Sequence, residues 1–202
     1  MTDSMADLIR KPRLIPPGST ILCAVSGGAD SIYLLHRLYR LRRSFSFTLA
    51  AAHYDHRIRG AESAQDMEFV REFVALCCGR ERVLRPDGST EFLPPVQLLT
   101  GSGDVAAQAR ASGRGLEETA REMRYAFLQE AARQAGAQFI ATAHTANDNG
   151  ETLLLHLARG TGLRGLCGIA PKYGNVIRPL LTTSREEIEG YLRFWGLPWR
   201  ED

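Results

Sequence analysis

The stretch Thr20-Ile-Leu-Cys-Ala-Val-Ser-Gly-Gly-Ala-Asp-Ser31 decides the fold of this 202-residue chain. It opens with a short apolar run rich in strand-forming side chains, and a glycine turn follows directly. Apolar residues then recur with a period of about 3.6 residues, at Ile32, Leu35, Leu38 and Leu41, which is typical of an amphipathic helix. The order of strand, glycine turn and helix predicts one unit of an α/β domain.

Similar units recur along the chain. Further strands are expected at 47–53, 96–99, 138–143 and 176–177, and further helices at 61–78, 104–111, 116–135, 151–158 and 184–195. Ser184, with Glu187 three residues later, is a capping-box signature. Strands alternating with helices predict an α/β fold, a doubly wound, mostly parallel sheet of about five strands with helices on both faces.

The chain is predicted to form a single domain, 1–202. Within it, the segment 79–95 loses its periodicity and gathers prolines and a glycine, so we expect a surface loop inserted between a helix and its strand. A chain that is 44% hydrophobic and 24% charged is not a disordered tail. No run approaches about 18 apolar residues and no signal peptide is recognisable, which predicts a cytoplasmic protein with no membrane partner.

The net charge and the cysteine content say little about which ligands the chain binds. The net charge of +2 is too small to indicate nucleic-acid binding by itself. Only Lys11 and Lys172 of the 25 basic residues are lysines. Arginine suits phosphate and base edges, although an arginine-biased genome would produce the same excess. The four cysteines lack C-x-x-C spacing, so we expect free thiols rather than a metal site.

The turn Ser26-Gly-Gly-Ala-Asp-Ser31 has the features of a phosphate site. Its two glycines let the backbone approach a ligand, and the following helix directs unpaired N–H groups at an anion. Ser26 and Ser31 add hydroxyl donors, and Asp30 suits a magnesium ion that bridges phosphate oxygens. The alternative is an ordinary strand-to-helix turn in which Asp30 favours the helix dipole.

Two further segments carry candidate polar groups, the first of them at the same sheet edge as the glycine turn. The run from His53 to Arg59 follows the second strand, where arginines would neutralise phosphate charge, although a histidine at a strand end is often only structural. Glu117, Arg121 and Arg124 share one helix face through their i,i+4 and i,i+3 spacing. By itself that spacing is typical of a solvated, salt-bridged surface.

A third segment follows the strand expected at 138–143. Asp148 and Glu151 are three residues apart, so both carboxylates share a helix face at the ligand edge, where they would hold a metal or an ammonium group. Helix capping by Asn147 or Asp148 also explains the acids. It does not explain His144, or the Arg159-Gly pair that follows.

In this order, from about Pro16 to Asp202, these segments resemble the tRNA(Ile)-lysidine synthases, which are N-type ATP pyrophosphatases with a PP-loop. The resemblance implies adenylation by ATP of the wobble cytidine of an isoleucine tRNA, with release of pyrophosphate. The amine of free lysine then displaces AMP. The implied cofactors are ATP and magnesium, and the implied partners are tRNA(Ile) with a cytidine at the wobble position and free lysine.

The resemblance also assigns roles residue by residue. ATP binding falls on Ser26, Gly27, Gly28, Ala29, Asp30, Ser31 and His53, with magnesium at Asp30. The catalytic candidates are Asp30, Asp148 and Glu151, of which the last two match acids associated with lysine. Further candidates for substrate or phosphate contacts are Arg59, Arg121, Arg124, His144 and Arg159.

The chain departs from the family pattern in two places. The family usually has His-His-x-Asp-Asp-Gln where this chain has His144-Thr-Ala-Asn-Asp-Asn149, so a second histidine and a first aspartate are missing. Family members also continue past Trp199–Asp202 into regions that bind tRNA. A tRNA thiolation enzyme of the same group and a nucleotide-binding module without ligase activity therefore remain alternatives.

Overall fold

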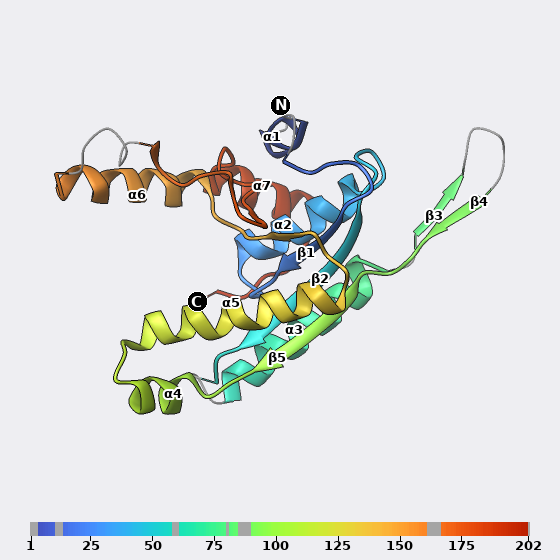
Figure 1. Cartoon of the computed structure of the whole chain (residues 1–202). Coiled ribbons are helices and arrows are strands. Elements are labelled where there is room, and N and C mark those ends of the chain that lie inside the picture. Colours follow the sequence, from blue (N-terminus) through green and yellow to red (C-terminus); the bar gives the residue numbers. More distant parts are fainter. Residues whose placement is uncertain are drawn as a thin grey trace.

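The computed structural model describes residues 4–10, 14–57, 61–79, 81–84, 90–160 and 167–201. A six-stranded sheet in the order β5-β2-β1-β6-β8-β7 forms its centre (Figure 1). The strands are β1 (Thr20–Ala24), β2 (Thr48–Asp55), β5 (Gln97–Ser102), β6 (Phe139–Ala141), β7 (Lys172–Tyr173) and β8 (Val176–Ile177). Among them β7 alone runs antiparallel to its neighbour, so the doubly wound, mostly parallel sheet is confirmed with one more strand than expected.

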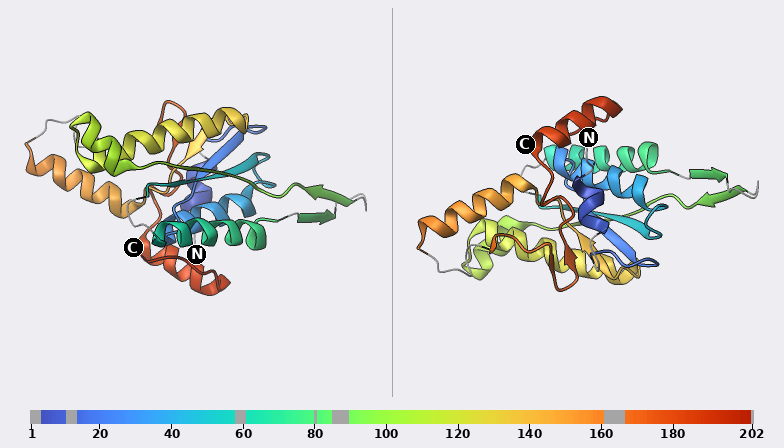
Figure 2. Two further views of the ribbon diagram at one scale, coloured as in Figure 1. Left: turned by 90° about the horizontal axis from the view of Figure 1, so that it is seen from below. Right: turned by 90° about the horizontal axis from the view of Figure 1, so that it is seen from above.

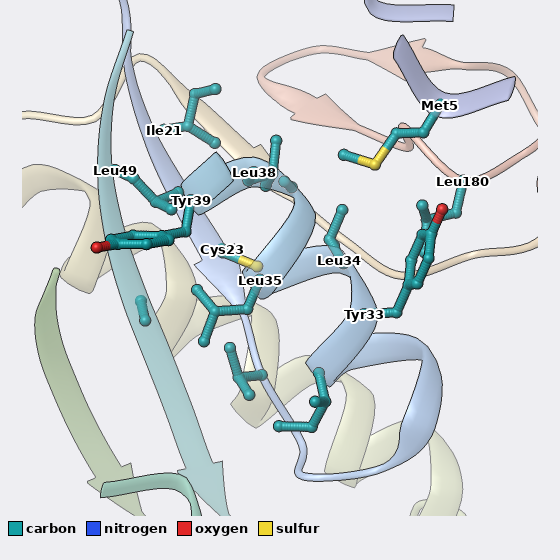
Figure 3. Packing of buried hydrophobic residues seen from close by; sticks show 14 of the residues in the cluster. Met5, Ile21, Cys23, Tyr33, Leu34, Leu35, Leu38, Tyr39, Leu49 and Leu180 are labelled. Carbon is teal, nitrogen blue, oxygen red and sulfur yellow. The ribbon is translucent and has the colours of Figure 1, made fainter. Parts of the chain in front are cut away.

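Helices cover both faces of this sheet (Figure 2). One face packs against α2 (Ala29–Leu41), α3 (Ala61–Cys77) and α7 (Arg185–Trp195), and the other packs against α5 (Leu116–Gln134), which α4 (Val105–Ser112) precedes. Successive side chains of a strand point to opposite faces of the sheet, so the sheet has a hydrophobic core on each face. Ile21 and Cys23 of β1 enter the first core, whereas Leu22 enters the second. Figure 3 shows Leu34, Leu35 and Leu38 of α2 in the larger core.

The strand order reverses beside β1. The chain runs outward from β1 to β2 and β5, and it then returns to β6 on the other side of β1. Ligands of open α/β sheets bind at such a reversal, beyond the carboxyl ends of the strands. The polar segments that follow β1, β2 and β6 therefore meet at one edge.

The N-terminal helix α1 (Ser4–Arg10) was not expected from the sequence. Its Met5 is fully buried, and its Ser4 hydroxyl donates to the Glu187 carboxylate at 2.9 Å. Ser184 caps α7 as expected, since its hydroxyl accepts from the Glu187 N–H at 3.2 Å. In a capping box the Glu187 carboxylate would accept from the Ser184 N–H. Here it accepts from the Ser4 hydroxyl and thereby links α1 to α7. None of the helices in the described ranges is long and apolar enough to cross a membrane.

The prediction that 79–95 forms a loop is wrong, because part of this segment forms β-strands. The segment contains β3 (Glu81–Leu84) and β4 (Thr90–Leu93), which pair antiparallel as an arm projecting from the body (Figure 1). Four-residue strands are too short to show a period, but the Pro86-Asp-Gly88 sequence between two such runs is a hairpin signal. Buried Arg42 anchors the arm, donating to the Pro94 carbonyl at 2.9 Å.

A second projection is α6 (Ala146–Ala158), which begins five residues before the expected start at 151 (Figure 1). Thr145 is its N-cap. The helix contains no buried residue, and it carries the exposed leucines Leu154, Leu155 and Leu157. Only its first turn lies near the carboxyl edge of the sheet, where Asp148 lines the cleft described next.

Candidate functional site

A cleft of about 1030 Å³ opens at the carboxyl ends of β1, β2 and β6. Most of the residues singled out in the sequence meet in it. Those that line it are Ser26, Gly28, Ala29, Asp30, Ser31, His53, Arg124, His144 and Asp148. The topological reversal therefore brings together the segments that follow β1, β2 and β6, and Arg124 of α5 joins them in the cleft.

The glycine turn is held by hydrogen bonds of its own. Gly27 has φ +106°, a conformation that side-chain-bearing residues rarely adopt, and it is buried rather than part of the cleft wall. The Ser31 hydroxyl oxygen accepts from the N–H groups of Ser26 and Gly27, each at 3.1 Å, and it donates to the Gly28 carbonyl at 2.9 Å. The hydroxyl hydrogen of Ser31 is thus used within the turn. The exposed Ser26 lines the cleft, and its hydroxyl donates to the Ser31 hydroxyl oxygen at 3.1 Å.

The first turn of α2 points its backbone into the same cleft. Gly28 is the N-cap and has no side chain to cap the helix. The first N–H groups of a helix have no partner inside it, and together they carry the positive end of the helix dipole. Gly28, Ala29 and Asp30 all line the cleft. The arrangement is an anion site made of backbone.

Asp30 faces both a cation and other carboxylates. Its Oδ2 lies 3.5 Å from the Arg185 guanidinium, whereas its Oδ1 is buried and has no hydrogen-bond partner. Burial raises the pKa of Asp30; Arg185 opposes that shift, and Asp148 and Glu189 add to it. The described residues contain no group of three or more side chains that could hold a metal ion by themselves.

His53 has one structural nitrogen and one available nitrogen. Its side chain is 4% exposed, and Nδ1 lies 2.9 Å from the Val25 carbonyl oxygen. Since a carbonyl only accepts, Nδ1 carries a hydrogen, and in the neutral ring Nε2 is then the acceptor. That Nε2 is buried without a partner beside the cleft. The nearby His56 also has a buried, unpartnered Nδ1, and its burial lowers its pKa.

The segment after β6 combines capping with cleft lining. Asp148 Oδ2 accepts from the Thr145 N–H at 2.6 Å, and the Thr145 hydroxyl accepts from the Asp148 N–H at 3.3 Å. The cap is therefore Thr145, not Asn147 or Asp148, and Asp148 occupies the N3 position of a capping box. His144 Nδ1 lies 3.0 Å from the Thr142 hydroxyl, and burial lowers the pKa of His144, which Arg178 lowers further.

Other sequence candidates lie away from this cleft. Glu151 is exposed and is not part of the described lining, although it follows Asp148 by one turn. Arg159 ends α6, about 20 Å along the helix from its start. Arg121 is exposed outside the lining and lies 5.3 Å from the ring centre of Tyr125. Arg59 lies outside the described residues.

Several cleft residues escaped the sequence analysis. Helix α7 presents Arg185, Glu189 and Arg193, whose four-residue spacing is the signal that would have identified them as one face. Arg200 also lines the cleft, and its N–H donates to the Gly27 carbonyl at 3.0 Å. Its guanidinium lies 2.9 Å from Asp66 of α3. Sequence spacing could not have identified Arg200, because it contacts the glycine turn only in the folded chain.

Almost the whole chain matches a known protein family. A model described as a PP-loop domain matches residues 2–202. The chain belongs to the PP-loop family. Among curated PP-loop relatives, it is 38% identical to a tRNA(Ile)-lysidine synthase of Dehalococcoides mccartyi, covering 100% of this chain and 41% of that one. It is 37% identical to the enzyme of that name from Geobacillus kaustophilus, with the same coverage. The chain thus spans about two-fifths of the length of these relatives.

A solved structure supports the PP-loop fold. The U34-tRNA thiolase NcsA from Methanococcus maripaludis superimposes with a TM-score of 0.69, covering 98% of this chain and 64% of that one. The two sequences are 14% identical, so the likeness concerns the fold alone.

Proposed function

We propose that this PP-loop domain uses ATP to ligate lysine to C2 of the wobble cytidine of an isoleucine tRNA. The reaction passes through an adenylated tRNA and releases pyrophosphate and AMP. The observation that carries the proposal is the first turn of α2, where a glycine N-cap leaves backbone N–H groups directed into the cleft beside the unpartnered Asp30 Oδ1. The relatives named tRNA(Ile)-lysidine synthase support the choice of substrates.

ATP would lie along the glycine turn. The N–H groups of the first turn of α2 would bind its phosphates. The Ser26 hydroxyl, which donates to Ser31 in the structure, would donate to a phosphate oxygen instead. The buried Nε2 of His53 would accept a hydrogen bond from a donor on the nucleoside. Binding there would satisfy an acceptor whose burial without a partner is otherwise unfavourable.

Magnesium fits this site as an ion shared with ATP. Mg²⁺ is commonly held by one or two carboxylates together with substrate phosphates and water. Asp30 offers its unpartnered Oδ1, and Asp148 has its second oxygen, Oδ1, besides the one used in the capping box. The ion would neutralise phosphate charge during transfer.

Each of the two proposed chemical steps has its own leaving group. The cytidine O2 attacks the α-phosphorus of ATP, and pyrophosphate departs. The lysine amine then attacks C2, and AMP departs with the former O2. A carboxylate that receives the amine proton acts as general base, a role for Asp148 or Glu151, and its charge also attracts the ammonium form before reaction.

The cysteines do not favour thiolation by this chain. Burial raises the pKa of Cys78 to about 12, so this thiol stays protonated near neutral pH. The described residues, which include all four cysteines, form no group of three or more potential metal ligands. Of the four, Cys167 is the exposed one.

The direct test is ATP-dependent transfer of isotope-labelled lysine to isoleucine tRNA, assayed for this chain and for a version extended at its C-terminus. Label in the tRNA from either version, together with release of pyrophosphate, supports the proposal. Transfer of labelled sulfur instead would establish the thiolation alternative. Binding of ATP without pyrophosphate release by either version would indicate a module without ligase activity.

A further inference from the structure

Two exposed aromatic side chains end helix α7 on the surface it shares with α2. Phe194 is 82% exposed and Trp195 is 44% exposed. The two helices pack against each other, as Figure 1 also shows. Together with Arg40 of α2 and Arg193 of α7, these residues form what we call the aromatic–arginine patch.

The rings of this patch are held in place from beneath. The Arg40 guanidinium lies 5.1 Å from the centre of the Trp195 ring, and the buried His36 ring meets Trp195 at 5.8 Å. His36 is fixed in turn by a 2.9 Å hydrogen bond to the Tyr191 hydroxyl. Phe194 packs edge-on against Trp195, with ring centres 5.7 Å apart. Because these rings are already ordered, a ligand that stacks on them loses little conformational freedom.

The charge around the rings is positive. Helix α2 carries Arg37 and Arg40 on this side and has no acidic residue after Asp30. Arg193 adds a third guanidinium, and Glu189, which pairs with it, is the adjoining acid on α7. Guanidinium groups attract phosphates, and aromatic faces stack bases without regard to sequence. The combination fits a single-stranded nucleic acid better than an apolar protein surface.

The patch is also continuous with the cleft. Arg185, Glu189 and Arg193 line the cleft along one side of α7, and Phe194 directly follows the last of them. From Arg185 to Arg193 the helix rises about 12 Å, the span of roughly two extended nucleotides. A strand with one base in the cleft can therefore reach Phe194.

We propose that the aromatic–arginine patch binds single-stranded RNA, stacking a base on Phe194 while Arg40 and Arg193 contact its phosphates. The identity of that RNA as the strand flanking the modified cytidine rests on the proposed function. The affinity of the patch for single-stranded RNA does not, since it requires neither ATP nor lysine.

The test measures fluorescence anisotropy of a labelled oligouridylate of roughly a dozen nucleotides, a length within the usual range of such sites. Phe194→Ala is expected to weaken binding by about tenfold or more, and Phe194→Trp is expected to restore it. Arg40→Gln is expected to lower the slope of log affinity against log salt by about 0.7, the value for one phosphate contact on a single strand. Thermal unfolding checks that each variant is folded.

Matched controls lie elsewhere on the surface. Tyr173 of β7 is 77% exposed, and Arg110 of α4 is exposed, so Tyr173→Ala and Arg110→Gln should leave the affinity and the salt slope unchanged. Wild-type affinity in Phe194→Ala, or equal losses in Phe194→Ala and Tyr173→Ala, would overturn the proposal. So would a change of oligomeric state in Phe194→Ala with RNA affinity intact, because the patch would then be a contact between copies.

The same variants separate this inference from the proposed function. Phe194 is outside the cleft lining, so Phe194→Ala should retain ATP binding. If lysine transfer fails in the wild-type chain while oligouridylate binding still depends on Phe194, the patch stands and the proposed function does not. If lysine transfer succeeds but RNA binding is independent of Phe194, only the patch is refuted.

Discussion

Arg185, at the start of α7, places its guanidinium 3.5 Å from Asp30 Oδ2, and both residues line the cleft. Its Nε also lies 3.2 Å from Glu189, so the cation is shared between two carboxylates. Burial raises the pKa of Asp30, and Arg185 counteracts that shift. Arg185 thus offsets part of the cost of burying a charge on Asp30, and it contacts Oδ2 while Oδ1 has no hydrogen-bond partner.

Replacing Asp30 therefore tests the proposed site most directly. Asp30→Asn keeps the size of the side chain but removes the charge proposed to hold magnesium. We expect pyrophosphate release to fall by at least about 100-fold, a typical cost of losing one charge-stabilising group. Asp7→Asn, at an exposed carboxylate of α1 paired with Arg10, is the control and should retain activity. Near-normal release by Asp30→Asn would exclude Asp30 from the reaction.

The two glycines of the turn should respond differently to alanine. Gly27 has φ +106°, so Gly27→Ala is expected to cost about 1–2 kcal/mol. Thermal unfolding should then occur about 2–8 °C lower for a chain of this length. At Gly28 an added Cβ would meet its nearest atom at 3.7 Å, an ordinary contact, so Gly28→Ala should unfold close to the wild-type temperature. Equal melting of both variants would contradict this account of the turn.

The two acids of α6 can be separated by substitution. Asp148 is part of a capping box, so Asp148→Asn should lower the free energy of unfolding by about 1 kcal/mol. Exposed Glu151→Gln should leave both stability and ATP binding unchanged, while raising the KM for lysine by about tenfold if its carboxylate attracts the ammonium group. Glu118→Gln, at an exposed acid of α5, is the control. Unchanged lysine kinetics in Glu151→Gln would remove that residue from the mechanism.

The strand that leads into the glycine turn and the helix that follows it made much of this architecture predictable. The period of the apolar residues and the alternation of elements sufficed for the sheet, since both follow from local burial. The hairpin arm was missed because four-residue strands show no period. Arg185 and Arg200 were missed for another reason, since their positions in the cleft depend on contacts between distant segments. Sequence spacing also paired Asp148 with Glu151, whereas the cleft brings Asp148 near Asp30.

Buried His36 should make stability fall in acid. Burial lowers its pKa from 6.5 to about 4, with Arg40 and Arg37 adding to the shift. The unfolded chain therefore binds the proton first, so the contribution to stability is complete above about pH 6.5 and declines as pH falls toward 4. We expect a loss of roughly 1–2 kcal/mol between about pH 7 and 5 from this residue. Denaturant unfolding of His36→Asn should show a correspondingly smaller loss, and identical pH profiles would refute the assignment.

Arginine substitutions distinguish the cleft from the end of α6. Arg124 lines the cleft, so Arg124→Ala is expected to weaken ATP or RNA binding by about tenfold, the effect of losing one charged contact. Arg159 caps the far end of α6, so Arg159→Ala should leave ATP affinity unchanged. Calorimetric titration with ATP and filter binding with tRNA separate the two ligands. A loss of ATP affinity in Arg159→Ala would mean that α6 folds back over the cleft.

The hydrogen bond from Arg200 to the Gly27 carbonyl has a consequence for biosynthesis. The glycine turn is translated about 170 positions before the residue that braces it. A nascent chain holding only the first sheet strands would present that turn without its brace. Nucleotide affinity should therefore mature late in translation, and ribosome-bound chains arrested before residue 200 has left the exit tunnel should bind ATP less tightly than released protein.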